Sequence, residues 1–595
     1  MTNTSTLRFP PHVLREYALL ADGERGAVVG PRGDIVWLCA PRWHDPSVFS
    51  ALIGGRGAFQ LAPEQPFVWG GSYDGASMIW RSRWVTTDGI VECREALAFP
   101  ADPHRVVLLR RVHALDRPTT VVGCVEPRGG YDEQPMTDLH RHGDVWTARI
   151  GSLYLRLTGA GDARARDGRS RLELALHLDA DERHDLVLEL SDRQLPDQPP
   201  EPDGAWRATE AAWAEAVPAF DHTLNPPDTR RSYAVLRGLT SSTGGMVAAA
   251  TTSLPERAEA GRNYDYRYAW IRDQCYAGQA AAAAGDTQLL DAAVDFVSAR
   301  ILDAGDKLAP AYTVTGAAVP DQCTLALPGY PGGADIVGNW VNDQFQLDAY
   351  GEALQLFGAA AAAGRLDSVH HDAIATAVSA VASRWHEPDA GMWEIEPRAW
   401  THSRLSAAAG LRAVAVIPEQ RGESAERSAL ADRIVADTST HALHPSGRWQ
   451  RAADDPGLDA ALLLPPLRGA LPIHDPRSVT TFHAYLDALT RNGYAYRFRH
   501  DERPLADAEG AFLLCGFLVA LTHHRLGNAV DARGWYDTTR AATGPAQLFS
   551  EEYDAVQHQM RGNLPQAFVH ALHLETAATL SAGTSADPTV EEGTS

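Results

Sequence analysis

The sequence predicts an all-β N-terminal sandwich followed by an all-α domain, whose helix count suits a closed double ring of helices, the (α/α)6 toroid. Short β-favouring runs alternate with turn residues from about Tyr17 to Ser191. Alanine- and leucine-rich helical stretches take over after about residue 228, and a proline-rich segment separates the two parts. A change of this kind in apolar periodicity indicates two fold classes in one chain.

Residues 1–193 are predicted to form the antiparallel β-sandwich. Clusters of glycine, aspartate and proline, such as ADGERG and GGSYDG, separate short apolar runs. Many short strands at this spacing are typical of a sandwich. The runs are GAVVG, DIVWLCA, ASMIWRSRWVTT, RVVLLRRVHAL, TTVVGCVEP, LYLRLTG, RLELALHL and HDLVLELS.

Residues 194–227 are predicted to be a linker with a connecting helix. The segment QLPDQPPEPDG, residues 194–204, contains four prolines. Proline is excluded from helix interiors and from central strands, so this segment marks a domain boundary. The stretch AWRATEAAWAEAVPAF that follows favours a helix.

Residues 228–583 are predicted to form the helical domain, with the acidic, polar tail at 584–595 disordered. About twelve helices in antiparallel pairs suit a closed double ring, although a bundle or a helical-repeat array would give a similar count. We find no repeat of fixed period. The helices are expected near 228–239, 271–285, 288–303, 343–363, 366–386, 403–416, 422–439, 456–465, 475–492, 507–526, 528–542 and 564–582.

The charge of the chain restricts its partners. The 53 basic and 76 acidic side chains give a formal net charge of −23. Nucleic acids and anionic membranes attract basic surfaces, so neither is an expected partner. The N-terminus lacks a basic start followed by an apolar segment, and no run of about 18 apolar residues occurs. We expect a cytoplasmic protein, and a homo-oligomer stays open.

Several cofactor classes are improbable. Lys307 is the only lysine and does not follow the last glycine of a phosphate loop, and a Schiff-base enzyme would depend on this same residue. The six cysteines include no CxxC pair, and no HExxH motif occurs. Adjacent histidines on a helix point about 100° apart, so the pairs 370–371 and 523–524 are poor metal ligands. We expect no metal and no organic cofactor.

The loops between the predicted helices combine aromatic, arginine and acidic residues. Examples are GRNYDYRYAWIRDQ, GNWVNDQFQLD, GMWEIEPRAWTHSR, YAYRFRHDERP and LFSEEYD. Aromatic faces cover the apolar face of a pyranose, while arginine and aspartate bind its hydroxyl groups. Packing between helices would explain any one such loop, but five together indicate a sugar site.

Two carboxyl groups are required for glycosidic cleavage. One protonates the leaving oxygen, and the other activates water or attacks carbon. Glu394 lies beside Trp393, and a carboxyl group buried against an aromatic ring favours its protonated form, as a general acid needs. Glu551 and Glu552 lie 157 residues further along and could supply the second group. With 76 acids in the chain, this pairing alone is weak evidence.

The motifs together resemble glycoside hydrolase family 15, which contains inverting glucoamylases and bacterial trehalase-like enzymes. NYDYRYAWIRD is similar to the signature of the family's first substrate loop, and TGGMVAAATTSLPE precedes it. GNWVNDQFQLDAYGE, EPRAWTHSR, EGAFLLCGFLV, LFSEEYD and GNLPQAF follow in the same order. The N-terminal stretch from residue 17 to 53 resembles the β-sandwich domain of the bacterial enzymes, so the likeness covers nearly the whole chain.

The resemblance implies a role for each residue that matches a motif. It makes Glu394 the general acid and Glu551 the general base, with Glu552 as a hydrogen-bonding support. Arg272 and Asp273 would bind hydroxyl groups of the non-reducing glucose, with ion pairing in the scaffold as the alternative. Tyr266, Trp270 and Trp393 would line the same subsite, and Arg497 is a fainter candidate for a hydroxyl contact.

The implied reaction is a single displacement with inversion, for which the carboxyl groups should lie roughly 6.5–9.5 Å apart. The resemblance favours an exo-acting enzyme that releases glucose from α,α-trehalose. An α-1,4- or α-1,6-linked glucan, or a glucosylated small molecule, is the alternative substrate. Two other functions stay open: a disaccharide phosphorylase, which needs only one catalytic carboxylate and an anion pocket, and a non-catalytic glucoside-binding protein.

Three positions depart from the expected family pattern. The loop after Glu394 is about two residues shorter, PAYTVTG has Val314–Thr315 in place of an acidic residue, and Arg404 stands in place of a lysine. None of these changes the proposed acid or base. We expect that they could alter which sugar lies beyond the scissile bond.

Overall fold

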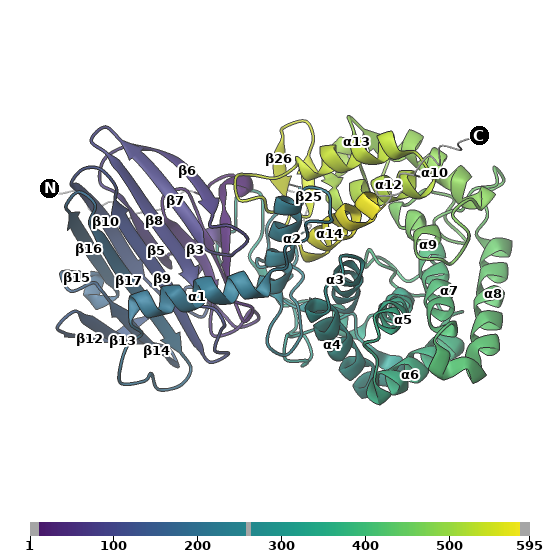
Figure 1. The fold of residues 1–595 in the computed structure, drawn as a ribbon, viewed down its shortest axis with the longest axis horizontal. Coiled ribbons are helices and arrows are strands. Elements are labelled where there is room, and N and C mark those ends of the chain that lie inside the picture. Colours follow the sequence, from purple (N-terminus) through teal and green to yellow (C-terminus); the bar gives the residue numbers. More distant parts are fainter. Residues whose placement is uncertain (1–10, 258–262, 583–595) are drawn as a thin grey trace, which may run out of the picture.

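The computed structural model describes residues 11–257 and 263–582. Two antiparallel sheets form the N-terminal part and helices form the C-terminal part, which confirms the predicted fold class (Figure 1). The predicted disordered tail, 584–595, lies outside the described residues.

The N-terminal part contains two sheets, and every pairing within them is antiparallel. In the described residues, one sheet has eight strands in the order β1-β2-β3-β5-β10-β16-β15, with β4 beside β3. Its strands are β1 (Ala18–Ala21), β2 (Gly26–Val29), β3 (Asp34–Cys39), β4 (Ser47–Phe49), β5 (Ala58–Pro63), β10 (Thr119–Glu126), β15 (Arg164–Arg166) and β16 (Arg171–Leu178).

The second sheet, over the same part of the chain, has nine strands in the order β11-β12-β13-β14-β17-β9-β8-β7-β6. Its strands are β6 (Phe67–Tyr73), β7 (Trp80–Thr86), β8 (Ile90–Leu97), β9 (Arg105–Ala114), β11 (Arg128–Gly129), β12 (Gln134–His142), β13 (Val145–Ile150), β14 (Leu153–Thr158) and β17 (Arg183–Ser191). The eight predicted runs coincide with β2, β3, β7, β9, β10, β14, β16 and β17.

An ion pair lies in the sandwich core between the two sheets. Arg110 of β9 and Glu95 of β8 are both fully buried and bonded to each other. Arg110 also donates to the carbonyl oxygens of Phe59 in the opposite sheet, at 3.0 Å, and of Gly33 in the turn between β2 and β3 of that sheet, at 2.7 Å. A buried charge is stable only when its hydrogen-bond partners are supplied in this way. Because the partners of Arg110 come from both sides of the core, the ion pair restricts how the two sheets can pack on each other.

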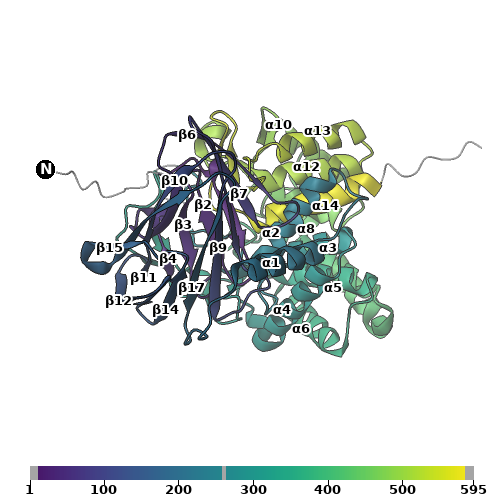
Figure 2. The ribbon, with the colours of Figure 1, turned by 60° about the vertical axis from the view of Figure 1, so that its left-hand side comes forward.

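Helix α1 (Pro202–Ala216) connects the sheets to the helical part (Figures 1 and 2). Pro202 occupies its first turn, where a missing N–H costs nothing, and the Glu201 side chain caps the backbone N–H groups of residues 203 and 204. Trp213 stacks on Phe99 of the sandwich, with ring centroids 4.4 Å apart. The proline-rich segment therefore leads directly into the first turn of helix α1.

The remaining long helices and the one-turn helix α9 form a closed double ring. Helices α3, α5, α7, α9, α12 and α14 contact one another in that order, and α14 contacts α3 again. Helices α2, α4, α6, α8, α10 and α13 lie outside them (Figure 1). This arrangement is the predicted (α/α)6 toroid, and it excludes an open bundle or array.

The inner helices are α3 (Ile271–Ala283), α5 (Leu347–Ala362), α7 (Thr401–Ala415), α9 (Leu464–Leu467), α12 (Leu513–Arg525) and α14 (Ala567–Ala582). The outer helices are α2 (Pro226–Leu239), α4 (Gln288–Ala304), α6 (Ser368–Arg384), α8 (Ser424–His441), α10 (Pro476–Leu489) and α13 (Ala529–Arg540). Short strands connect some of them: β18 (Ala269–Trp270), β19 (Ala311–Tyr312), β20 (Cys323–Thr324), β21 (Ile336–Val337), β22 (Thr490–Arg491), β23 (Tyr494–Ala495), β24 (Ala511–Phe512), β25 (Glu552–Asp554) and β26 (Gln559–Arg561).

Three predicted helices differ from the structure. The helix expected at 507–526 is interrupted: α11 (Leu505–Ala508) ends first, and β24 pairs with β25 before α12 begins. The stretch 456–465 forms a 3₁₀ turn, Ala460–Leu463, that runs into α9. Pro465 and Pro466 lie in the first turn of that helix, and Gly469, with a φ of 83°, follows its end, so α9 has a single turn. The helix expected from 343 begins at Leu347, after a 3₁₀ turn at Val341–Asp343.

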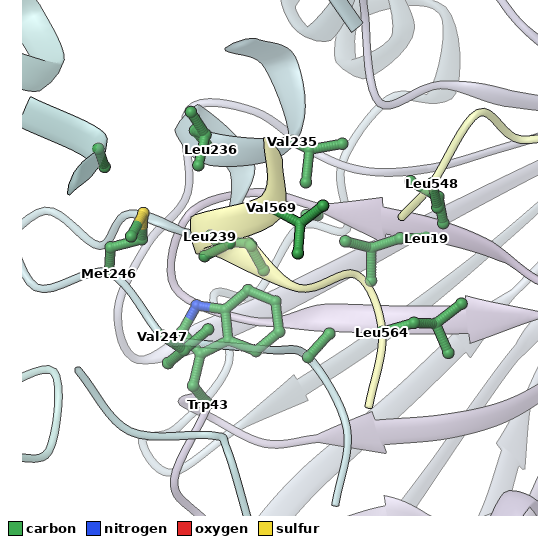
Figure 3. Close-up of a cluster of buried hydrophobic side chains, with 14 of the residues drawn as sticks. Leu19, Trp43, Val235, Leu236, Leu239, Met246, Val247, Leu548, Leu564 and Val569 are labelled. Atoms are coloured by element: carbon green, nitrogen blue, oxygen red, sulfur yellow. The ribbon is translucent and has the colours of Figure 1, made fainter. Parts of the chain in front are cut away.

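The sandwich and the ring share a hydrophobic core. Figure 3 shows Leu19 and Trp43 of the sandwich clustered with side chains of α2, of the loop that follows it, of α14 and of the loop that precedes α14. Trp43 is 1% exposed, and its indole N–H donates to the carbonyl oxygen of Gly23 at 2.8 Å. The interface is therefore packed like a domain interior. No helix in the described ranges is both long and apolar enough to cross a membrane.

Candidate active site

One cavity of about 120 Å³ opens at the ends of the inner helices. The loops before α3, α7, α12 and α14 contribute to its wall, together with the first turns of α3, α12 and α14. All eight residues predicted as site residues line it: Tyr266, Trp270, Arg272, Asp273, Trp393, Glu394, Arg497 and Glu551. The fold thus gathers side chains that are up to 285 residues apart in the sequence.

Glu394 lies in a tight turn before α7. Its φ is 55°, in the left-handed region that residues with a side chain rarely adopt, and Gly391 of the same turn has a φ of 67°. The carboxylate oxygen Oε1 accepts hydrogen bonds from Trp270 Nε1 at 2.6 Å and from Arg272 Nη2 at 3.4 Å. A strained residue held by two donors in a cavity is typical of a functional site.

Glu551 immediately precedes β25, so it and Glu552 point to opposite sides. Glu551 faces the cavity, is 2% exposed, and accepts a hydrogen bond from the Tyr266 hydroxyl at 3.0 Å. Burial and the neighbouring Glu256 carboxylate raise the pKa of Glu551 well above its usual value, although Arg497 and Tyr266 act in the lowering direction. The carboxylate side chain fits because residue 562 is a glycine with a φ of 74°.

Arg272 and Asp273 occupy the first turn of α3. Besides Glu394, Arg272 donates to Gln346 Oε1 at 2.9 Å and lies 3.5 Å from Asp348. Asp273 is 2% exposed, and its Oδ1 atom has no hydrogen-bond partner within the described residues. Burial raises the pKa of Asp273 to about 7, with Arg272 opposing and Glu394 adding to the rise. A buried oxygen without a partner beside the cavity is suited to a ligand hydroxyl group.

Aromatic side chains form the walls. Tyr266 stands edge-to-face with Trp270, with ring centroids 5.5 Å apart, and stacks on Tyr264 at 6.1 Å. Trp393 stands edge-to-face with Phe512 at 5.3 Å, and its indole N–H donates to Asp459 Oδ1 at 2.7 Å. Both tryptophans are thus held by hydrogen bonds and packing, which fixes the shape of the cavity before a ligand enters.

Arg497 lies among carboxylates at the edge of the cavity. Its guanidinium group bonds to Glu256 at 3.0 Å, Glu509 at 2.7 Å and Glu552 at 3.1 Å. Although burial acts in the raising direction, Arg497 and His500 lower the pKa of Glu509 to about 2. Ion pairing is therefore the observed use of Arg497, and its contact with a substrate hydroxyl stays a prediction.

Sequence reasoning missed several residues of the cavity wall. Glu256 ends the motif before the first loop, and His500 lies in the YRFRH loop, so both were in segments already singled out. Trp340, 58% exposed, was in the aromatic loop GNWVNDQ. No local pattern distinguished these residues from others in their loops, because which side chain faces the cavity is decided by tertiary packing. The other missed residues are Ala248, Tyr264, Tyr276, Met392, Ile395, Phe498, Phe512, Leu514, Gln566 and Phe568.

Two of the three departures from the expected motifs lie away from the cavity. Val314, Thr315 and Arg404 are not part of its wall as the structure describes it. The Arg404 guanidinium group is buried and directed at backbone carbonyl oxygens of residues 386 and 387, at 3.4 Å. The shortened loop after Glu394 does reach the cavity, through Ile395.

This chain is similar to known proteins in sequence and in fold. The sequence model described as "Glycosyl hydrolases family 15" matches residues 231–578, and that described as "Trehalase-like, N-terminal" matches residues 10–149. A trehalase of Mycobacterium tuberculosis is 30% identical over 96% of this chain and 90% of its own length. A trehalase of Mycolicibacterium smegmatis is 29% identical over 95% of this chain and 91% of its own.

Among solved structures, a bacterial glucoamylase complexed with acarbose has the same fold. It covers 97% of both chains with a TM-score of 0.71 and 13% sequence identity. The family model covers more than half of the chain, and the glutamates and aromatic residues of its motifs meet in one cavity. The chain is therefore a glycoside hydrolase and belongs to glycosyl hydrolases family 15.

Proposed function

We propose that this enzyme is an inverting, exo-acting α-glucosidase whose substrate is α,α-trehalose. The observation that carries the proposal is the pair of glutamates, Glu394 and Glu551, in the wall of one aromatic-lined cavity. They are held by different partners, Trp270 for Glu394 and Tyr266 for Glu551. Two carboxyl groups with separate supports suit two separate roles in glycosidic cleavage.

In the proposed reaction, Glu394 donates its proton to the glycosidic oxygen as the bond from that oxygen to the anomeric carbon breaks. A water molecule attacks the anomeric carbon from the opposite face, and Glu551 accepts the proton of that water. Water is consumed, and the two carboxyl groups exchange protonation states. A protonated Glu551 could not accept this proton, so activity requires a pH above its raised pKa.

Binding would use the groups around the two glutamates. The unpartnered Oδ1 of Asp273 and the guanidinium group of Arg272 would bind hydroxyl groups of the non-reducing glucose. The faces of Trp270 and Trp393 would cover its apolar surface. Arg497 would act mainly through the carboxylates that it pairs with.

The choice of trehalose is supported by the two mycobacterial relatives, which are named trehalases and align over nine-tenths of their length. The test is glucose release, with anomers followed by proton NMR, from trehalose, maltose, isomaltose and maltotriose. Inversion at one anomeric carbon of trehalose yields one β- and one α-glucose at first, whereas retention yields two α-glucose molecules. Activity on maltose or isomaltose alone would replace trehalose by a glucan as the substrate.

The same assay separates the two other functions. A phosphorylase would release a glucose phosphate only when phosphate is present and would tolerate Glu551→Gln, because phosphate replaces activated water. A binding protein would bind glucosides and release nothing. Hydrolysis without phosphate that is lost in Glu551→Gln contradicts both.

A further inference from the structure

Arg267, one residue from Tyr266, is a fully buried arginine that the proposed chemistry does not use. Its guanidinium group forms a bidentate ion pair with Asp265, with Nε to Oδ1 at 2.9 Å and Nη2 to Oδ2 at 2.6 Å. Both side chains are 0% exposed, so the pair lies in a medium of low dielectric constant. A buried pair of this kind is costly to separate and holds its neighbours in one geometry.

The remaining donors of Arg267 reach the sandwich. Nη1 donates to the carbonyl oxygens of Trp43 at 3.3 Å and Asp45 at 3.1 Å, and lies 3.2 Å from Cys39 Sγ. Nη2 donates to the Tyr131 hydroxyl at 2.9 Å. All four partners belong to the N-terminal sandwich, and Trp43 is also part of the shared core (Figure 3).

Asp265 connects the pair to a second loop of the cavity. Its Oδ2 atom accepts the backbone N–H of Gly338 at 2.9 Å, and its carbonyl oxygen accepts Asn339 Nδ2 at 3.5 Å. Trp340 follows directly and lines the cavity. The pair therefore lies where the sandwich, the first substrate loop and the loop that carries Trp340 meet.

We propose that Arg267 is a positioning residue. Through it, the sandwich holds Tyr266 in contact with Glu551 and holds Trp340 in the wall of the cavity. The role of Glu551 in this inference rests on the proposed function. Tyr266 is adjacent to Arg267 in the chain, and its hydroxyl bond to Glu551 fixes the carboxylate that would activate water. The N-terminal sandwich thus helps to position the groups of the cavity, although its described residues do not line the cavity itself.

A second buried arginine offers a matched control. Arg231 of α2 also joins the ring to the sandwich, donating to the carbonyl oxygen of Gly75 at 2.7 Å and lying over the Tyr73 ring, 3.8 Å from its centroid. It does not belong to the cavity wall. Arg231→Lys therefore weakens the contact between the two parts without touching a substrate loop.

The experiment compares Arg267→Lys, Tyr131→Phe and Arg231→Lys with wild type and Tyr266→Phe. We expect Arg267→Lys to lower kcat by about 10- to 100-fold, as small displacements of catalytic groups do, and to move the acidic limb of the pH profile of kcat/KM in the same direction as Tyr266→Phe. Tyr131→Phe removes one hydrogen bond of Arg267 but keeps its ion pair with Asp265, so it should lower kcat and shift the acidic limb by smaller amounts. Arg231→Lys should lower the melting temperature and leave kcat and the pH profile as in wild type.

Wild-type kinetics and pH profile in folded Arg267→Lys would overturn the inference, as would equal kinetic losses in Arg231→Lys. If Arg267→Lys does not fold, Tyr131→Phe decides: a lower kcat with a shifted acidic limb supports the inference, and an unchanged enzyme overturns it. A crystal structure separates this result from the proposed function. If wild type cleaves no α-glucoside, the proposed function fails, while the separation of Tyr266 from Glu551 in the variants still tests the positioning role against the 3.0 Å of the intact enzyme.

Discussion

Gly562 is the residue whose substitution tests most simply whether the position of Glu551 matters. A Cβ atom on residue 562 would lie 2.7 Å from Glu551 Oε2 and 2.9 Å from its Cβ, where ordinary contacts begin at 3.4 Å. The residue also has a φ of 74°, so alanine there is strained by roughly 1–2 kcal/mol. In Gly562→Ala the Glu551 carboxylate must therefore move by somewhat less than 1 Å.

A displacement of about 1 Å in a catalytic group costs on the order of 100-fold in rate, so we expect kcat to fall by about 10- to 100-fold. The assay is steady-state kinetics on the preferred α-glucoside, with thermal unfolding measured alongside. Gly447→Ala is the control, because Gly447 has a φ of 87° and no atom within 4 Å of its added Cβ. Both variants should lose stability, and only Gly562→Ala should lose activity. Wild-type kcat in folded Gly562→Ala would refute the assignment of Glu551 as a catalytic group.

Four further changes act on the charged groups of the site. Tyr266→Phe removes a hydrogen bond that lowers the pKa of Glu551, so the acidic limb of kcat/KM should move to higher pH. Glu256→Gln removes the repulsion between two carboxylates that raises this pKa, so the same limb should move to lower pH. Arg497→Met removes the guanidinium group that three buried carboxylates share and should lower the free energy of unfolding by about 3–5 kcal/mol in denaturant titrations. Asp273→Asn should lower kcat/KM by roughly 10- to 100-fold through a lost hydrogen bond to a charged group.

Each of these has a contradicting outcome. If Tyr266→Phe and Glu256→Gln shift the acidic limb of kcat/KM in the same direction, that limb does not report the titration of Glu551. An unfolding free energy of Arg497→Met equal to that of wild type would show that the carboxylates around it are protonated or hydrated. An Asp273→Asn enzyme with wild-type kcat/KM on trehalose would remove this carboxylate from the glucose subsite.

The acid-induced loss of stability follows from the same groups. A carboxyl group whose pKa is lowered in the folded state contributes stability above its unfolded pKa and loses it as the pH falls through the folded value. For Glu509 the folded value is about 2, so its pairing with Arg497 persists from neutral pH until well below the ordinary range of a glutamate. The contribution of Glu551 to stability depends on pH in the opposite direction. Because its pKa is raised in the folded state, protonation of Glu551 favours the folded state.

Periodicity and motif order were sufficient to predict the fold class. The predicted apolar runs of the sandwich and the long amphipathic helices follow local patterns, whereas several other strands do not. β6 was not predicted because its sequence, FVWGGSY, contains two glycines, and β24 was taken as part of a helix because its pairing partner lies 40 residues later. The limits 1–193, 194–227 and 228–583 stay predictions.

The site was predicted from motifs, not from local chemistry. The structure places all eight predicted residues in one cavity, but their catalytic and binding roles stay proposals. Arg497 illustrates the limit: the sequence shows an arginine near aromatic residues, while its three carboxylate partners lie up to 241 residues away from it along the chain. Likewise, no local signal marked Arg267 as the contact between the sandwich and the first loop.

The central claim is that Glu394 is the acid and Glu551 the base of a single displacement. The most direct test compares hydrolysis of trehalose with hydrolysis of α-glucosyl fluoride, whose leaving group needs no proton. Glu394→Gln should lose trehalose hydrolysis and keep fluoride hydrolysis with β-glucose as the first product, while Glu551→Gln should lose both. Loss of fluoride hydrolysis in Glu394→Gln, with its retention in Glu551→Gln, would exchange the two roles and contradict the account.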